Sequence, residues 1–226
     1  MQRRYVVVAY PPGAGIKQTF KFSSEEIRHI LISMAVLILG FTFFLMGGIL
    51  NFRLGAFLLL LIISAVGVST EFLLHELAHK FTAQKYGCWS EYRYTEMGLA
   101  LTIISGLFGF LIAAPGVVWH TGYVTQKEEG KISAAGPATN LGLGALFLVF
   151  YLAAVYFAPG NIFLAYLTWM VGFINVWVGG FNMIPISPFD GSKIARWSIP
   201  VYILLFMALI LVGVALFMSG SYIRFW

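Results

Sequence analysis

Three ionisable side chains in the run Glu71-Phe-Leu-Leu-His75-Glu76-Leu-Ala-His79 have the types and spacing of a metal site. His75 and His79 are four residues apart, so on a helix their imidazoles project from one face and can bind one metal ion. Glu76 follows the first imidazole, where its carboxylate could accept a proton from a water that the metal activates. The alternative is a chance pattern with two buried histidines. The run ends an apolar stretch that begins near Leu54, and ionisable residues in membrane spans are costly and usually functional, which favours the metal site.

A hydrolytic zinc site takes three protein ligands and leaves one position for water, so a third ligand is needed. Asp190 is our first choice, because it ends the stretch Asn182-Met-Ile-Pro185-Ile-Ser-Pro188-Phe-Asp190. Two prolines three residues apart cannot lie in a regular helix, so the chain must unwind before Asp190. Unwound backbone at membrane depth is tolerated only where it is buried in protein or lines a wet cavity. The sequence therefore predicts that Asp190 reaches the metal site.

Other side chains could also take part. Glu71 lies four residues before His75, on the same helix face, and is the second choice for the third ligand. It fits equally well as the hydrogen-bonding partner of a ligand imidazole and as a carboxylate paired elsewhere in the bundle. Cys88, the single cysteine, is a weaker ligand candidate and excludes an intrachain disulfide. We expect His120 to be a solvated loop histidine.

The elements that position these residues belong to a membrane protein. The chain has 226 residues, of which 60% are hydrophobic and 10% are charged, and its mean hydropathy is +0.87. A soluble domain carries about 25% charged residues. The net charge of +5 is therefore expected to report membrane topology and not nucleic-acid binding. The N-terminus lacks the features of a signal peptide.

The predicted fold is an all-α, polytopic membrane protein with five to six transmembrane helices. Residues 1–28 are expected to form a surface segment, with a hairpin of strands 5–10 and 16–22. Residues 29–223 would form the transmembrane domain, with its core at 55–195. Ser23 and Glu26 have the spacing of a capping box and predict the start of the first helix. The expected spans are 29–51, 55–83, two spans between 132 and 189 that begin at Ala134 and turn at Pro159, and 197–223.

The segment 97–119 is apolar enough to cross the membrane, but its glycines and Pro115 make it a poor straight helix. If it enters and returns as a re-entrant loop or hairpin, residues 1–28, 80–131 and 185–196 share one side of the membrane. These three regions carry 12 of the 14 Lys and Arg residues. The positive-inside rule then places the N-terminus and the active site toward the cytoplasm, most simply in the cell membrane.

Three motifs in this order resemble the site-2 protease family of intramembrane zinc metalloproteases, close to its archaeal and bacterial members. They are His75-Glu76-x-x-His79, Gly136-Pro137-x-x-Asn140 and Asn182-x-x-Pro185-x-x-Pro188-x-Asp190-Gly191. The resemblance covers about residues 55–195. It departs from the family at Ser187, where a third proline is common, and at Phe189, where leucine is common. We expect altered loop packing there and an intact ligand.

The resemblance implies one zinc ion bound by His75, His79 and Asp190, with Glu76 as catalytic base. It implies that Asn140 contacts the substrate backbone and that a membrane-embedded β-hairpin follows the first motif. The supporting residues would be Gly136, Pro137, Asn182, Pro185, Pro188 and Gly191. The segment 80–131 is too short for the PDZ domain that many members carry, and we expect no CBS pair.

Amide hydrolysis in a transmembrane protein or peptide is therefore the predicted reaction, in contact with the lipid bilayer. A helical substrate must unwind, and an extended segment could pair with a strand edge in the region 97–119. The alternative from another class is a zinc transporter or a non-catalytic metal-binding relative. Glu76 favours the protease, because a transport site gains little from a base beside the metal. The sequence leaves the substrate, the gate and the oligomeric state open.

Overall fold

The computed structural model of the chain describes residues 5–7 and 22–220, and of residues 5–7 only the backbone. The turn and nearly all of the second strand of the expected N-terminal hairpin lie outside these residues, so that hairpin stays a prediction. The described part of the chain contains five helices that are long and apolar enough to cross a membrane: Ser24–Leu45, Leu54–Lys85, Gln126–Phe157, Ile162–Asn182 and Ile199–Gly220. The predicted fold class is confirmed.

The second of these helices changes its winding before the metal motif. It consists of α2 (Leu54–Val68), a π-helical turn (Ser69–Leu73) and α3 (Leu74–Lys85). Single π-helical turns inside α-helices occur frequently at functional sites. Here the π-helical turn contains Glu71, and α3 contains both histidines of the motif.

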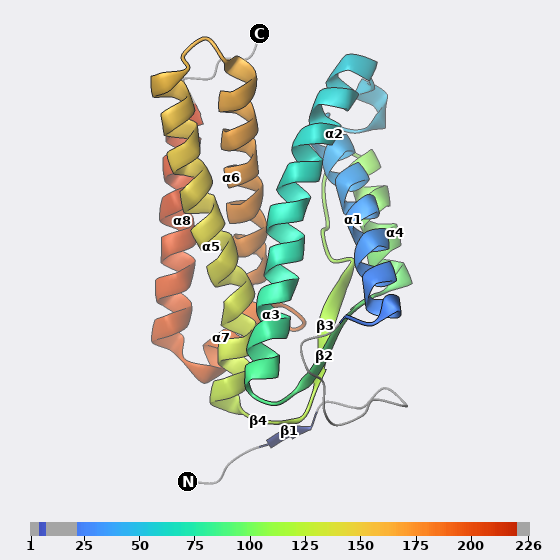
Figure 1. Ribbon diagram of the computed structural model, residues 1–226, viewed down its shortest axis with the longest axis vertical. Coiled ribbons are helices and arrows are strands. Elements are labelled where there is room, and N and C mark those ends of the chain that lie inside the picture. The colour runs from blue at the N-terminus through green and yellow to red at the C-terminus, as the bar shows by residue number, and fades with distance from the viewer. Residues whose placement is uncertain (1–4, 8–21, 221–226) are drawn as a thin grey trace.

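The helices form two groups (Figure 1). In one group α5 (Gln126–Phe157), α6 (Ile162–Asn182) and α8 (Ile199–Gly220) pack on one another. In the other, α1 (Ser24–Leu45) packs on α2 and on the short α4 (Glu96–Leu107). The helix α3 lies between the groups and packs along α5. The motif His75-Glu76-x-x-His79 is therefore carried by the helix that lies between the two groups.

Two small sheets of two strands each lie at the end of the molecule that contains α3. Strand β2 (Trp89–Tyr94) pairs antiparallel with β3 (Gly116–Thr121), while β1 (Tyr5–Val7) pairs with β4 (Tyr123–Thr125). The outer edge of β2 is closed by α1, because Tyr92 and Tyr94 donate their main-chain N–H groups to Glu26 and His29.

This pairing also fixes the orientation of β3. Because Tyr92 points its main-chain groups away from β3, its register partner Val118 points its own groups away from β2. The edge of β3 at Val118 therefore faces outward from the two-stranded sheet.

The segment 97–119 does not form a full span. It contains α4, whose 12 residues are fewer than the roughly 17 needed to cross a bilayer, followed by extended chain and β3. The glycines that argued against a helix here allow close packing of two helices. A Cβ on Gly106 would lie 2.4 Å from the carbonyl oxygen of Gly40 in α1. The segment expected to be a re-entrant loop or hairpin is thus the helix α4 and the strand β3, which pairs with β2.

The predicted start of the first helix at the N-cap Ser23 is confirmed, but its capping box and the start of the third span need correction. Ser23 caps α1 through the N–H of Glu26, but the Glu26 carboxylate is fully buried and binds Lys80, so only half of the capping box forms. The third span starts at Gln126 instead of Ala134, because Thr125 and Glu128 form a complete capping box. Hydropathy did not predict the first turn of this helix, because that turn contains charged residues.

Candidate metal centre

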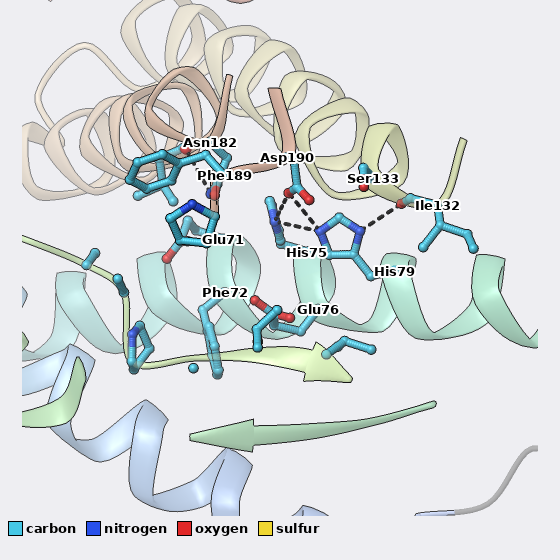
Figure 2. A pocket seen from close by; sticks show the side chains of 18 of the residues that line it. Glu71, Phe72, His75, Glu76, His79, Ile132, Ser133, Asn182, Phe189 and Asp190 are labelled. Carbon is cyan, nitrogen blue, oxygen red and sulfur yellow. Dashed lines mark hydrogen bonds and ion pairs between the residues drawn. The ribbon is translucent and has the colours of Figure 1, made fainter. Parts of the chain in front are cut away.

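Three elements bring the predicted ligands together. His75 and His79 project from one face of α3, and Asp190 is the first residue of α7 (Asp190–Trp197). The Nε2 atom of His79 lies 3.0 Å from Nε2 of His75 and 3.0 Å from Oδ2 of Asp190. The distance from His75 Nε2 to the same carboxylate oxygen is 3.4 Å. Figure 2 shows these side chains pointing toward one another between α3 and α7.

The second ring nitrogen of each imidazole, Nδ1, is hydrogen-bonded to a residue of α5. Nδ1 of His79 donates to the carbonyl oxygen of Ile132 at 2.8 Å, and because a carbonyl only accepts, Nδ1 carries the proton. Nδ1 of His75 lies 3.3 Å from Oδ1 of Asn140 and donates to it. In the neutral rings both Nε2 atoms therefore present lone pairs to the space beside Asp190.

This arrangement fits a metal ion. Two imidazole lone pairs and a carboxylate oxygen converge, and they repel one another unless a cation lies among them. The set of two nitrogens and one oxygen is one that zinc takes in hydrolases. A carboxylate binds a metal ion in its deprotonated form, so Asp190 would be a ligand as the anion.

The helix α5 approaches the ligands closely at Gly136. A Cβ at this position would lie 2.4 Å from Nε2 of His79 and 2.5 Å from Nε2 of His75. Both distances are shorter than any real Cβ contact, so only glycine allows this packing. Pro137 follows inside the same helix. Gly136 is thus placed at the metal centre itself, a role that the sequence did not reveal.

The chain unwinds between α6 and α7, as the prolines predicted, and Pro185 and Pro188 lie in this stretch. Gly191 lets the stretch fold back, because a Cβ there would lie 2.2 Å from the carbonyl oxygen of Met183. Asn182 bonds to the Val178 carbonyl in its own helix and lines the same cavity as the metal ligands. These contacts place Asp190 at the start of α7.

Phe189, which stands where leucine is common in the family, packs against Phe181 of α6. The two rings meet edge to face, with centroids 4.9 Å apart.

Glu76 faces the same cavity from the other side of His75 (Figure 2). Its carboxylate accepts a hydrogen bond from the main-chain N–H of Val118 at the outer edge of β3. Its Oε2 atom is buried and has no partner among the described residues. One oxygen is thus held by β3 while the other remains available inside the cavity.

The hydrogen-bonding partner of the His75 imidazole is Asn140 and not Glu71. Glu71 is buried and lines the cavity, yet its Oε2 atom has no hydrogen-bond partner within residues 22–220. The group of potential metal ligands contains His75, His79 and Asp190, and Glu71 is outside it. Asn140 is fully buried, so its contact with a ligand imidazole is an alternative to the predicted contact with substrate.

The expectation for His120 is wrong. It is a strand residue of β3, only 7% exposed, and it lines the cavity of the metal centre. The sequence placed it in a loop because it stands just after the apolar segment 97–119. Cys88 packs with Ala83, Val124 and Ile132 in a small apolar cluster and is not among the three ligand candidates found in the described residues.

Comparisons with known proteins agree with this site. The chain is 42% identical over 202 residues to the Methanocaldococcus jannaschii protein named "Putative zinc metalloprotease MJ0611", which covers 88% of this chain and 97% of that protein. It is 33% identical to "Putative zinc metalloprotease Rip3" of Mycobacterium tuberculosis over 58% of this chain and 30% of that one. It is 29% identical to "Zinc metalloprotease MJ0392" of Methanocaldococcus jannaschii over 55% of this chain and 30% of that one.

A scan against protein-family models gave no match. A search of the solved structures also gave no match. Because the first relative aligns over nearly its whole length, and because the three motifs lie around one candidate zinc site, the chain belongs to the site-2 protease family of zinc metalloproteases.

Proposed function

We propose that this chain is an intramembrane zinc metalloprotease, which hydrolyses peptide bonds in or near transmembrane segments of other membrane proteins. One observation carries the proposal. The ligand set His75, His79 and Asp190 shares a cavity with Glu76, one of whose carboxylate oxygens has no partner among residues 22–220. The site lies near the end of a helix long enough to cross a membrane. A transport site needs the ligands but not the carboxylate.

The ligands would hold zinc, which supplies Lewis acidity that polarises a carbonyl and acidifies water. The residues of the chain perform the remaining tasks. Ile132 and Asn140 keep both imidazoles in the tautomer that presents Nε2. Glu76 accepts the proton of the attacking water and passes it to the leaving amine. Val118 holds the other side of the Glu76 carboxylate, so the free oxygen keeps its place.

The substrate would be a transmembrane segment that has unwound locally. A helix hides its carbonyl groups in internal hydrogen bonds, and zinc can polarise a carbonyl only after that bond is released. We expect the unwound segment to lie in the cavity between β3 and the stretch before α7, since both line it. The basic residues on the side of the active site support an orientation toward the cytoplasm of a cell membrane.

The test is cleavage of a transmembrane substrate by the purified protein in liposomes, with zinc content measured in parallel. Glu76→Gln should abolish cleavage while the protein keeps one zinc, and a chelator should abolish cleavage by the wild type. Glu96→Gln is the matched control, because Glu96 is exposed on α4. Cleavage that survives Glu76→Gln would refute the assignment. A wild type that holds zinc and cleaves none of a panel of substrates would favour metal binding or transport.

A further inference from the structure

His120 is a buried polar side chain for which the mechanism above has no use. It lies on β3 and lines the same cavity as Glu76 and Asp190. Its Nε2 atom is buried and finds no hydrogen-bond partner in the described part of the chain. Leaving such an atom unpaired is costly. A side chain that lines a cavity and has an unpaired atom is therefore a candidate contact for what enters the cavity.

The proton on this ring can be assigned. The carbonyl oxygen of Val118 accepts a hydrogen bond from the His120 ring, and because Nε2 has no partner among the described residues, Nδ1 is the donor. Burial, with smaller contributions from Lys193 and His79, lowers the pKa of His120 to about 4. The ring is neutral at pH 7, so Nε2 carries a lone pair and can only accept a hydrogen bond.

The same contacts determine which main-chain hydrogen-bonding groups of β3 are available to a substrate. The outward N–H of Val118 donates to Glu76, and its carbonyl accepts from His120. The single N–H of Val118 is therefore used by Glu76, so a substrate carbonyl cannot accept from it, while the carbonyl oxygen of Val118 keeps a second lone pair. His120 adds a further acceptor beside that carbonyl.

An unwound substrate needs such an acceptor. Each residue that leaves a helix releases a main-chain N–H, which is costly to leave unpaired away from water. Of the other acceptors at the centre, both Nε2 atoms of the motif and Asp190 face the metal position, and Glu76 is the base. Glu71 also lines the cavity, but from the π-helical turn before α3 and not from β3. We propose that Nε2 of His120 accepts a hydrogen bond from one main-chain N–H of the unwound substrate segment, near the bond that is cleaved. The inference rests on the proposed function.

Backbone ester substitution tests it directly. Replacing one substrate amide at a time by an ester removes that N–H, and the scissile bond is left as an amide throughout. Two variants distinguish the roles of the two ring nitrogens of His120. His120→Asn keeps a donor near Nδ1 for the Val118 carbonyl but has no atom at the position of Nε2, whereas His120→Gln places an amide at the reach of Nε2. Thr121→Val is the control, since Thr121 is the buried strand neighbour of His120 and lies outside the cavity lining.

We expect one ester position at which wild type and Thr121→Val lose about tenfold in kcat/KM. His120→Asn should lose about tenfold on the all-amide substrate and nothing further at that ester position, while His120→Gln should recover part of the rate. The inference is overturned if no ester position lowers the wild-type rate, whatever the variants do. It is also overturned if the ester penalty is the same in His120→Asn as in wild type. A wild type that cleaves no substrate at all would instead remove the proposed function and this inference with it.

Discussion

Adding one methyl group to α5 should disable the metal centre. In Gly136→Ala the new Cβ would lie 2.4 Å from Nε2 of His79, whereas ordinary van der Waals contact begins at 3.4 Å. Either α5 or the imidazoles must therefore retreat by about 1 Å. Metal–ligand distances tolerate only about 0.2 Å, and a misplacement of about 1 Å at a reacting centre can cost about 100-fold in rate. Overpacking itself should cost only about 1–3 kcal/mol of stability.

The expected result for Gly136→Ala is a folded protein that loses zinc in a chelator competition and at least about 100-fold in kcat/KM. The matched control is Gly142→Ala on the same helix, where a Cβ meets no described atom within 4 Å. That variant should keep its zinc and should be as stable as wild type or more stable, because alanine is the better helix former. If Gly136→Ala retains one tightly bound zinc and a rate within threefold of wild type, the packing argument at α5 is refuted.

Three further perturbations address single contacts. Asn140→Leu removes the acceptor for His75 and should weaken zinc binding about 10- to 100-fold in a chelator titration; unchanged affinity with a raised KM would assign Asn140 to substrate alone. Lys80→Met leaves Glu26 buried without its ammonium and should lower the free energy of unfolding by about 3–5 kcal/mol, much of which the added Glu26→Gln change should restore. Burial keeps the pKa of His120 at about 4 in the folded chain, against about 6.5 when unfolded, so the folded state binds fewer protons. Stability should be complete above about pH 6.5 and fall by up to about 3 kcal/mol toward pH 4 in denaturant titrations, with a flatter profile in His120→Asn.

The features that the sequence predicted correctly depend on residues within a single segment of the chain. The five spans follow from uninterrupted apolar runs. The common face of His75 and His79 follows from helical spacing, and the unwinding before Asp190 follows from Pro185 and Pro188. These depend on the chain's local geometry, so they can be inferred without knowing which segments touch.

The misses depend on contacts between distant segments. Glu26 has the spacing of a capping box, yet its carboxylate binds Lys80, which lies 54 residues away in the chain. His120 stands just after an apolar segment and was expected in a loop, but pairing with β2 makes it part of a buried strand. A polar side chain takes the partner that tertiary packing brings to it, and local patterns do not contain that information.

One such contact pattern is visible in the sequence once the packing is known. Ile132, Gly136 and Asn140 are spaced by four, as are His75 and His79. On two helices that run side by side these positions form two facing stripes. The carbonyl of Ile132 accepts from His79, Asn140 accepts from His75, and Gly136 between them leaves room for both Nε2 atoms. The reversed order of the pairs means that α3 and α5 run antiparallel. Because each residue turns a helix by about 100°, a shift of one residue in α5 would break all three contacts at once, so the spacing of the second motif is dictated by the first.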